Sequence, residues 1–325
     1  MDRDPRISWV RPLTSASDWS LERLSHGRST TVSVVLPALN EQATVGRIAS
    51  EVRRNLMERT NPLVDELIVL DSGSTDATAD VARAAGARVL RSDEILGRIP
   101  AVVGKGEAMW RAVAASRGDV VVFVDADLES FTARHIVGLL GPLLTDESVD
   151  FVKAAYHRPV QAVGPATVGG GRVTELVARP LLNLYWPALA DIVQPLAGEY
   201  AVRRSVLEIL PFPCGYGVDF GLLVDTADRC GTLAIAQVDL GTRLHRHQDD
   251  LRLGRMATEI IKVAMARLRK EDHVAPDRLT GTSLTQFRRS ADGFAAEIHE
   301  VAGLERPALR DVPEYVAGRA ATLAR

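Results

Sequence analysis

The chain of 325 residues has 46% hydrophobic and 25% charged residues, which is typical of a soluble globular protein with room for one large α/β domain. Its formal net charge of −3 excludes a general attraction to nucleic acid or to an anionic membrane, so any phosphate binding has to be local. No apolar run reaches the roughly 18 residues that cross a bilayer, the N-terminus has no signal-peptide core, and Cys214 and Cys230 indicate neither a metal site nor a disulfide framework. We therefore expect a cytoplasmic protein without nucleic-acid or membrane partners.

Strands and helices alternate through the first 130 residues. Apolar, β-branched runs predict buried parallel strands over 31–37, 65–71, 87–90 and 119–127. Between them we expect a helix over about 41–58 with Asn40 as its N-cap, a helix from Ser74 or Thr75 to Gly86, and a helix from about Gly106 to Arg117. This order predicts an α/β fold with a mostly parallel, doubly wound sheet flanked by helices.

The second half of the chain is less regular. Strands are expected over 150–157 and 233–241, a strand passing into a short helix over 199–210, and a helix over 218–231 that ends at its glycine. A glycine-rich stretch at 168–180 leads into another helix, and an amphipathic helix covers about 251–271. We expect the first 29 residues to be irregular and the tail beyond 271 to be helical or irregular.

Polar or charged residues follow three of the predicted strands at the point where each strand ends. Because parallel strands end at the same edge of a sheet, and ligands of open α/β sheets bind outside that edge, we expect these groups to converge on one site. The three segments are Pro37-Ala38-Leu39-Asn40-Glu41, Asp71-Ser72-Gly73-Ser74 and Asp125-Ala126-Asp127.

Asp125 and Asp127 are the sharpest candidates for metal binding. Four apolar residues, 121–124, lead the two carboxylates at alternate positions to the sheet edge. Two neighbouring carboxylates repel each other unless a cation compensates them, and a hard divalent ion such as Mg²⁺ or Mn²⁺ also grips a diphosphate. The alternative is that Asp125 caps a turn and Asp127 is solvated, but the two polar strand ends beside them favour a metal site.

Two further segments can reach the same edge. His245-Arg246-His247 follows the last predicted strand, and histidine is a good Mn²⁺ ligand; a surface or capping role is the alternative. Lys105, one of only four lysines in the chain, stands between two glycines at the mouth of a helix, where backbone N–H groups and an ammonium favour an anion. A solvated lysine near a flexible loop is the alternative. The spacing around Lys105 excludes a Walker A loop.

The second half also contains residues that suit an anionic or sugar ligand. Three glycines precede Arg172 and Thr174, so that backbone, a guanidinium and a hydroxyl can surround a phosphate or carboxylate; a flexible linker is the alternative. Tyr216 and Asp219 stand at the start of the helix 218–231. Asp219 there either stabilises the helix N-terminus or binds sugar hydroxyls.

Several motifs carry a resemblance to known families. VSVVLPALNE, ELIVLDSGSTDAT and VVVFVDAD resemble the core of GT-A glycosyltransferases. GKGEAMWRA, GGGRVTELVARPLL, QPLAGEYAVRR, GYGVDFGLLVDTADR and IAQVDLGTRLHRH resemble the glucosyl-3-phosphoglycerate synthases of actinobacteria, and the likeness covers roughly residues 31–265. The resemblance implies a retaining, dimeric transferase that uses Mg²⁺ or Mn²⁺ to convert a nucleoside-diphosphate glucose and 3-phosphoglycerate to glucosyl-3-phosphoglycerate.

The resemblance also implies roles for individual segments and residues. We divide the chain into an N-terminal extension (1–29), a nucleotide-sugar-binding GT-A half (30–130), an acceptor-binding half of the same domain (131–250) and a C-terminal helical extension (251–325). Asp127 and His245 would be the principal metal ligands with Asp125 assisting, and the catalytic groups would be Asp127, Asp219 and Lys105. The nucleotide sugar would be bound by Pro37, Ala38, Leu39, Glu41, Asp71, Ser72, Lys105, Asp125 and Ala126. The acceptor would be bound by Gly171, Arg172, Thr174, Tyr216, Arg243 and His247.

Three positions beside the nucleotide sugar or the acceptor depart from the family pattern. This chain has Ala126 where the family has serine, Asp219 where it has glutamate, and His247 where it has asparagine. The departures leave UDP-glucose, GDP-glucose and GDP-mannose open as donors, since the related mannosyl-3-phosphoglycerate synthases would share nearly every feature.

The resemblance implies a mechanism in which a metal held by Asp127 and His245 neutralises the charge that develops on the departing diphosphate. Retention would follow from attack on the same face of the sugar, with no residue acting as a nucleophile. The competing hypotheses are an inactive nucleotide-sugar-binding protein, a nucleotidyltransferase, and a membrane-linked transferase with a lipid acceptor. The intact acidic and basic groups argue against an inactive binding protein. A nucleotidyltransferase would normally have a glycine-rich basic loop after the first strand, which this chain lacks, and the lack of a spanning segment argues against a membrane-linked transferase.

Overall fold

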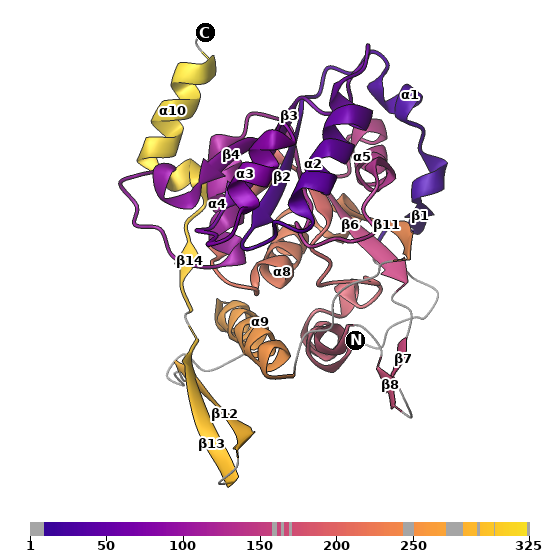
Figure 1. Ribbon diagram of the computed structural model, residues 1–325. Coiled ribbons are helices and arrows are strands. Elements are labelled where there is room, and N and C mark those ends of the chain that lie inside the picture. The colour runs from indigo at the N-terminus through magenta and orange to yellow at the C-terminus, as the bar shows by residue number, and fades with distance from the viewer. Residues whose placement is uncertain are drawn as a thin grey trace.

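An eight-stranded sheet in the order β1-β11-β6-β9-β5-β2-β3-β4 forms the centre of the molecule (Figure 1). The computed structural model describes residues 10–157, 161–163, 166–168, 171–242, 250–270, 282–290, 293–301 and 303–323. The strands of the sheet are β1 (Leu13–Ser15), β2 (Val32–Ala38), β3 (Glu66–Asp71), β4 (Arg88–Arg91), β5 (Val120–Phe123), β6 (Phe151–His157), β9 (Tyr200–Arg203) and β11 (Ile235–Thr242). All neighbours pair in parallel except β9, which is antiparallel to both β5 and β6, so the predicted mostly parallel sheet is confirmed.

Helices cover both faces of this sheet. One face carries α2 (Val45–Val52), α3 (Thr78–Ala84) and α5 (Ala133–Thr145). The other carries α4 (Lys105–Ala115), α6 (Arg179–Tyr185), α8 (Val218–Cys230) and α9 (Asp250–Lys270). Because side chains alternate along a strand, each central strand supplies both cores: Val34 packs on the first face and Val35 on the second, and both are fully buried. The remaining α-helices in the described ranges are α1 (Leu21–Ser25), α7 (Arg204–Leu207) and α10 (Pro313–Leu323).

Within the described ranges, three antiparallel strand pairs lie outside the central sheet. They are β7 (Gln161–Val163) with β8 (Ala166–Val168), β10 (Phe212–Pro213) with β14 (Glu305–Arg306), and β12 (Ser283–Ser290) with β13 (Gly293–Glu300). The hairpin β12–β13 stands away from the sheet beyond α9 (Figure 1). The C-terminal segment therefore has the expected helices, α9 and α10, and in addition a hairpin that the sequence pattern did not indicate.

Helix starts are where the structure differs most from the prediction. Asn40 is not an N-cap: its φ is +60°, and its side chain instead accepts a hydrogen bond from the Thr75 N–H (2.8 Å), so α2 begins only at Val45. Ser74 and Thr75 do not cap α3 either, because that helix begins at Thr78 after Ala77.

Three further differences concern strands and one helix. The strand predicted over 119–127 ends at Phe123, and 124–127 follow it as a loop. The N-terminal segment, expected to be irregular, contributes β1 to the sheet by pairing with β11. Helix α5, whose hydrophobic residues pack beneath β5 and β6, was not predicted.

Candidate active site

The loops that follow β2, β3 and β5 meet at the carboxyl edge of the sheet. The Ser72 N–H after β3 donates to the Ala38 carbonyl of β2 (3.0 Å). The Thr44 hydroxyl, beyond β2, donates to the Ala126 carbonyl in the loop after β5 (2.6 Å). Parallel pairing of β5, β2 and β3 has thus brought the three predicted strand-end segments to one edge.

Lys105 joins this edge to the second half of the chain. Its ammonium lies 2.9 Å from Asp125 Oδ1 and donates a hydrogen bond to Asp219 Oδ2 at 3.0 Å. Burial lowers the pKa of Lys105, but the attraction of Asp125 and Asp219 outweighs burial and raises the pKa, so the side chain is a fixed positive charge. Three predicted site residues, from α4, the β5 loop and α8, therefore form one ion-paired cluster.

Asp219 is held from both sides. The Tyr200 hydroxyl of β9 donates to Asp219 Oδ1 at 2.9 Å, while Lys105 donates to Oδ2. Burial and then the charge of Asp219 raise the pKa of Tyr200, so that the phenol keeps its proton and remains a donor. Asp219 also lies in the first turn of α8, where the helix dipole favours a carboxylate. Tyr200 was not predicted as a site residue.

Gly104 and Gly198 permit close packing around the cluster of Lys105, Asp125 and Asp219. A Cβ atom at Gly198 would lie 2.1 Å from Asp125 Oδ2, and a Cβ atom at Gly104 would lie 2.3 Å from the Cys214 carbonyl oxygen. Gly104 also has a φ of +153°, a backbone angle that residues with a side chain rarely adopt. The absence of side chains at these two positions lets Asp125 and the start of α4 approach neighbouring backbone closely.

A buried ion network supports α4 from within the protein. Glu107 is 1% exposed and accepts hydrogen bonds from Arg111 (2.7 Å) and from Arg306 (2.6 Å). Burial raises the pKa of the Glu107 carboxyl, but the hydrogen bonds from Arg306 and Arg111 outweigh it and hold the pKa below its usual value. Because Arg306 belongs to β14, the network ties the C-terminal segment to the helix that presents Lys105.

The other residues predicted for the nucleotide sugar lie around the ends of β2 and β3. Asp71 is buried and accepts a hydrogen bond from the Ser74 N–H (2.9 Å). The Glu41 N–H donates to the Thr78 hydroxyl (2.7 Å), and Leu39 is 45% exposed. Pro37, Ala38 and Ser72 lie in or next to the paired strand ends.

The described residues predicted for the acceptor lie beside α9. Arg172 forms an ion pair with Asp250 in the first turn of α9, and Thr174 is almost fully buried at the start of the helical segment Thr174–Ala178. Gly171 precedes them with a φ of +88°. The Tyr216 N–H donates to Glu259 Oε2 of α9 (2.6 Å), while the Tyr216 side chain is half exposed.

His245, the third predicted metal ligand, lies outside the described residues. So do Arg243 and His247, which were predicted to bind the acceptor. Within the described part of the chain, no three His, Cys, Asp or Glu side chains form a group that could hold a metal ion. Asp125 and Asp127 supply carboxylate oxygens from one loop, which suits a hard divalent cation that takes its remaining ligands from elsewhere. No helix in the described ranges is long and apolar enough to cross a membrane.

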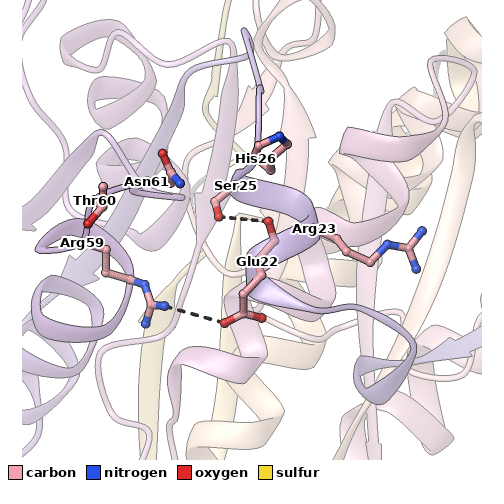
Figure 2. A pocket seen from close by; sticks show the side chains of 7 residues that line it. All are labelled: Glu22, Arg23, Ser25, His26, Arg59, Thr60 and Asn61. Carbon is pink, nitrogen blue, oxygen red and sulfur yellow. Dashed lines mark hydrogen bonds and ion pairs between the residues drawn. The ribbon is translucent and has the colours of Figure 1, made fainter.

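An open groove of about 760 Å³ lies between α1 and the turn 59–61 (Figure 2). Glu22 and Arg59 approach each other across it at 3.7 Å. Both lining segments precede the strands β2 and β3, so the groove is at the amino edge of the sheet. Since ligands of open α/β sheets bind at the carboxyl edge, the groove is not the candidate active site.

Comparisons with known proteins identify the family of the chain. The family model described as Glycosyl transferase family 2 matches residues 33–161, which include β3, β5 and all of β2 but its first residue. The chain is 46% identical to the glucosyl-3-phosphoglycerate synthase of Mycolicibacterium smegmatis, over 92% of this chain and 94% of the relative.

Two solved structures extend the likeness to the whole fold. The glucosyl-3-phosphoglycerate synthase of Mycobacterium tuberculosis, in complex with Mn²⁺, UDP-glucose and phosphoglyceric acid, is 44% identical with a TM-score of 0.76, covering 93% of this chain and 97% of its own. The mannosyl-3-phosphoglycerate synthase of Rubrobacter xylanophilus is 37% identical with a TM-score of 0.84, covering 92% and 96%. The chain has the GT-A glycosyltransferase fold and belongs to the glucosyl-3-phosphoglycerate synthase family.

Proposed function

We propose that this protein is a retaining glucosyltransferase that moves glucose from UDP-glucose to 3-phosphoglycerate and releases glucosyl-3-phosphoglycerate. The observation that carries the proposal is the Lys105–Asp125–Asp219 cluster at the carboxyl edge of the sheet. Ligands of open α/β sheets bind outside this edge, and the chain is 44% identical to a protein solved with UDP-glucose and phosphoglyceric acid.

A divalent cation, Mn²⁺ or Mg²⁺, is part of the proposal. Asp127 and His245 would hold it, with Asp125 assisting, and it would stabilise the negative charge of the leaving diphosphate. The Asp125 carboxylate occupies the space that a side chain at position 198 would fill, so Gly198 leaves room for it. Lys105 would add a positive charge on the diphosphate side, independent of pH in the physiological range.

The two halves of the chain would bind the two substrates. The half 30–130 would take the nucleotide sugar through Pro37, Ala38, Leu39, Glu41, Asp71, Ser72, Lys105, Asp125 and Ala126. The half 131–250 would take 3-phosphoglycerate through Gly171, Arg172, Thr174, Tyr216, Arg243 and His247. The guanidinium of Arg172 suits a carboxylate or phosphate because it can donate two hydrogen bonds in one plane.

Asp219 would orient the transferred sugar rather than attack it. Both of its carboxylate oxygens already accept hydrogen bonds, from Tyr200 and from Lys105, and these hold the plane of the carboxylate fixed. Retention would then follow from attack by the acceptor hydroxyl on the same face of the sugar. The leaving phosphate oxygen would accept the proton of that hydroxyl.

The experiment is a donor panel of UDP- and GDP-linked glucose and mannose with 3-phosphoglycerate, assayed with Mn²⁺, with Mg²⁺ and with a chelator. We expect turnover with UDP-glucose that requires metal. Transfer from GDP-mannose is the second candidate activity, motivated by the TM-score of 0.84 to a mannosyl-3-phosphoglycerate synthase. Nucleotide that binds but is never released with any acceptor would instead support an inactive binding protein.

We also propose that the enzyme is a cytoplasmic homodimer. Residues 1–29 and 251–325 would extend the catalytic domain at its two ends, and both contribute to its packing, through β1 in the sheet and α9 on one face. The hairpin β12–β13 offers an apolar side chain for contact with a second copy, because Ile298 is 71% exposed. The assembly state is measured by light scattering after size exclusion, and a monomer at micromolar concentration would contradict the dimer.

A further inference from the structure

Lys153 is a buried lysine that takes part in none of the hydrogen bonds or ion pairs described above. It lies within β6, its side chain is fully buried, and among the described residues its Nζ has no hydrogen-bond partner. Lysine is rarely buried in this way, because removing an ammonium from water is costly unless a partner compensates it. Packing alone does not account for a charge at this position, since an apolar side chain would fill the space without that cost.

Strand register places Lys153 beneath the candidate site. Lys153 pairs with Tyr200 of β9, and Tyr200 pairs in turn with Phe123 of β5. Side chains directly opposite each other on neighbouring strands point to the same face of the sheet. Lys153 therefore shares the face that α4 and α8 cover, on which Tyr200 meets Asp219.

Lys153 lies against the ring of Tyr200. Its Nζ is 4.2 Å from the centre of that ring, well inside the range of a cation–π contact. Phe151 stacks on the ring at 5.2 Å and Phe123 packs against it at 5.3 Å. With neighbours on these sides, the ring is fixed, and its hydroxyl is directed at Asp219 Oδ1.

The charges that face Lys153 come from four elements. They are Asp219 on α8, Lys105 on α4, Glu199 next to β9 and Asp125 after β5. Burial lowers the pKa of Lys153 to about 8, and among these charges Asp219 acts on it most strongly. Lys153 and Asp219 are thus coupled both electrostatically and through the Tyr200 side chain that touches them both.

We propose that Lys153 is a positioning residue for glucosyl transfer: it fixes the Tyr200 ring and, through it, the Asp219 carboxylate in the orientation that receives the transferred sugar. The proposal deepens the proposed function and rests on it for the role of Asp219. Lys153 itself touches no substrate in this scheme. Its effect appears in the rate of transfer rather than in the binding of the nucleotide.

The test is Lys153→Met, which keeps an unbranched apolar side chain as far as Cε and removes the ammonium group with its charge. We expect kcat with UDP-glucose and 3-phosphoglycerate to fall on the order of 100-fold, as for a displaced catalytic group. The Kd for UDP with Mn²⁺ should stay within about twofold, and the melting temperature should not fall. Lys270→Met, at a side chain 63% exposed, is the matched control and should leave kcat unchanged. A kcat of Lys153→Met within about twofold of the wild type overturns the proposal.

Tyr200→Phe provides a second test that does not depend on the folding of the lysine variant. It removes only the hydroxyl, and we expect a loss of kcat comparable to that of Lys153→Met, with UDP binding again unchanged. Because both residues act through Asp219, the double variant should lose little more than the poorer single variant. Full activity of Tyr200→Phe, or fully additive losses, overturns the proposal. A wild type inactive on every donor would overturn the proposed function and this inference with it, whereas an active wild type with unaffected variants overturns the inference alone.

Discussion

Replacement of Lys153 by methionine should stabilise the protein even though we expect it to impair catalysis. Burial lowers the pKa of Lys153 from its ordinary value of 10.5 to about 8. A difference of this size corresponds to ~3 kcal/mol of disfavoured charged form in the folded state. Part of this would be offset by the lost contact with the Tyr200 ring, which contributes about 1–2 kcal/mol at a desolvated site. A net gain of about 1–2 kcal/mol at pH 7 remains.

The pH dependence gives the reasoning its sharpest test. Below pH 8 the lysine is charged in both the folded and the unfolded chain, and the whole penalty is present. Between pH 8 and 10.5 the unfolded chain binds more protons at this residue than the folded chain, so the contribution of Lys153 to stability rises with pH. The advantage of Lys153→Met over the wild type should therefore shrink as the pH is raised from 7 to about 10.

Urea unfolding at pH 7 and at pH 9.5, followed by far-ultraviolet circular dichroism, measures both differences. Lys270→Met is again the control, because its exposed ammonium should give the same small difference at both pH values. A Lys153→Met variant that is less stable than the wild type at pH 7 would refute the reasoning. An advantage that does not change with pH would refute it as well, because the gain would then come from packing and not from charge.

Three further predictions concern the same site. Asp127→Ala should lower metal-dependent turnover by about 100-fold or more with an unchanged melting temperature, and near-normal rates would remove Asp127 from the proposed metal site. Glu107→Ala should destabilise the protein by about 3 kcal/mol in urea unfolding, because Arg111 and Arg306 lose their buried counter-charge; a change below 1 kcal/mol would mean that this network contributes little. Gly198→Ala should weaken activation by Mn²⁺ about 10-fold, because the added methyl group must displace the Asp125 carboxylate, whereas Gly97→Ala, where nothing lies within 4 Å, should match the wild type.

The central strands and the meeting of their ends could be predicted because both depend on local signals. Apolar runs identify β2, β3 and β5, and parallel pairing then forces 37–41, 71–74 and 125–127 onto one edge whatever the rest of the chain does. Helix starts were less predictable. Asn40, Ser74 and Thr75 are good cap residues, but here they bond one another between loops, a long-range choice that no local pattern reveals.

The residues that complete the site come from pairings far apart in the sequence. Tyr200 is one aromatic residue in a short strand, and its role depends on Asp219 lying above it and Lys153 beside it. Arg306 lies almost 200 positions from Glu107 and reaches it only because β14 pairs with β10. Lysine is rare in this chain, and that rarity supported Lys105 as a site residue. The same argument applies to Lys153, which is another of the four lysines.

The topology also explains why the site cannot be divided between two independently stable halves. Strand β9 of the second half is inserted between β5 and β6, so the sheet of the first half is completed only when the second half has folded against it. The same insertion carries Tyr200 into place, and α8 then supplies Asp219 to Lys105 of the first half. Without the Asp219 carboxylate, Lys105 would keep only its ion pair with Asp125. Without Lys105, the Asp125 and Asp219 carboxylates would lose this positive charge at a site where they are largely buried. The Lys105–Asp219 ion pair is therefore also a contact between the halves. A segment covering 30–130 alone should neither bind a nucleotide sugar nor unfold cooperatively.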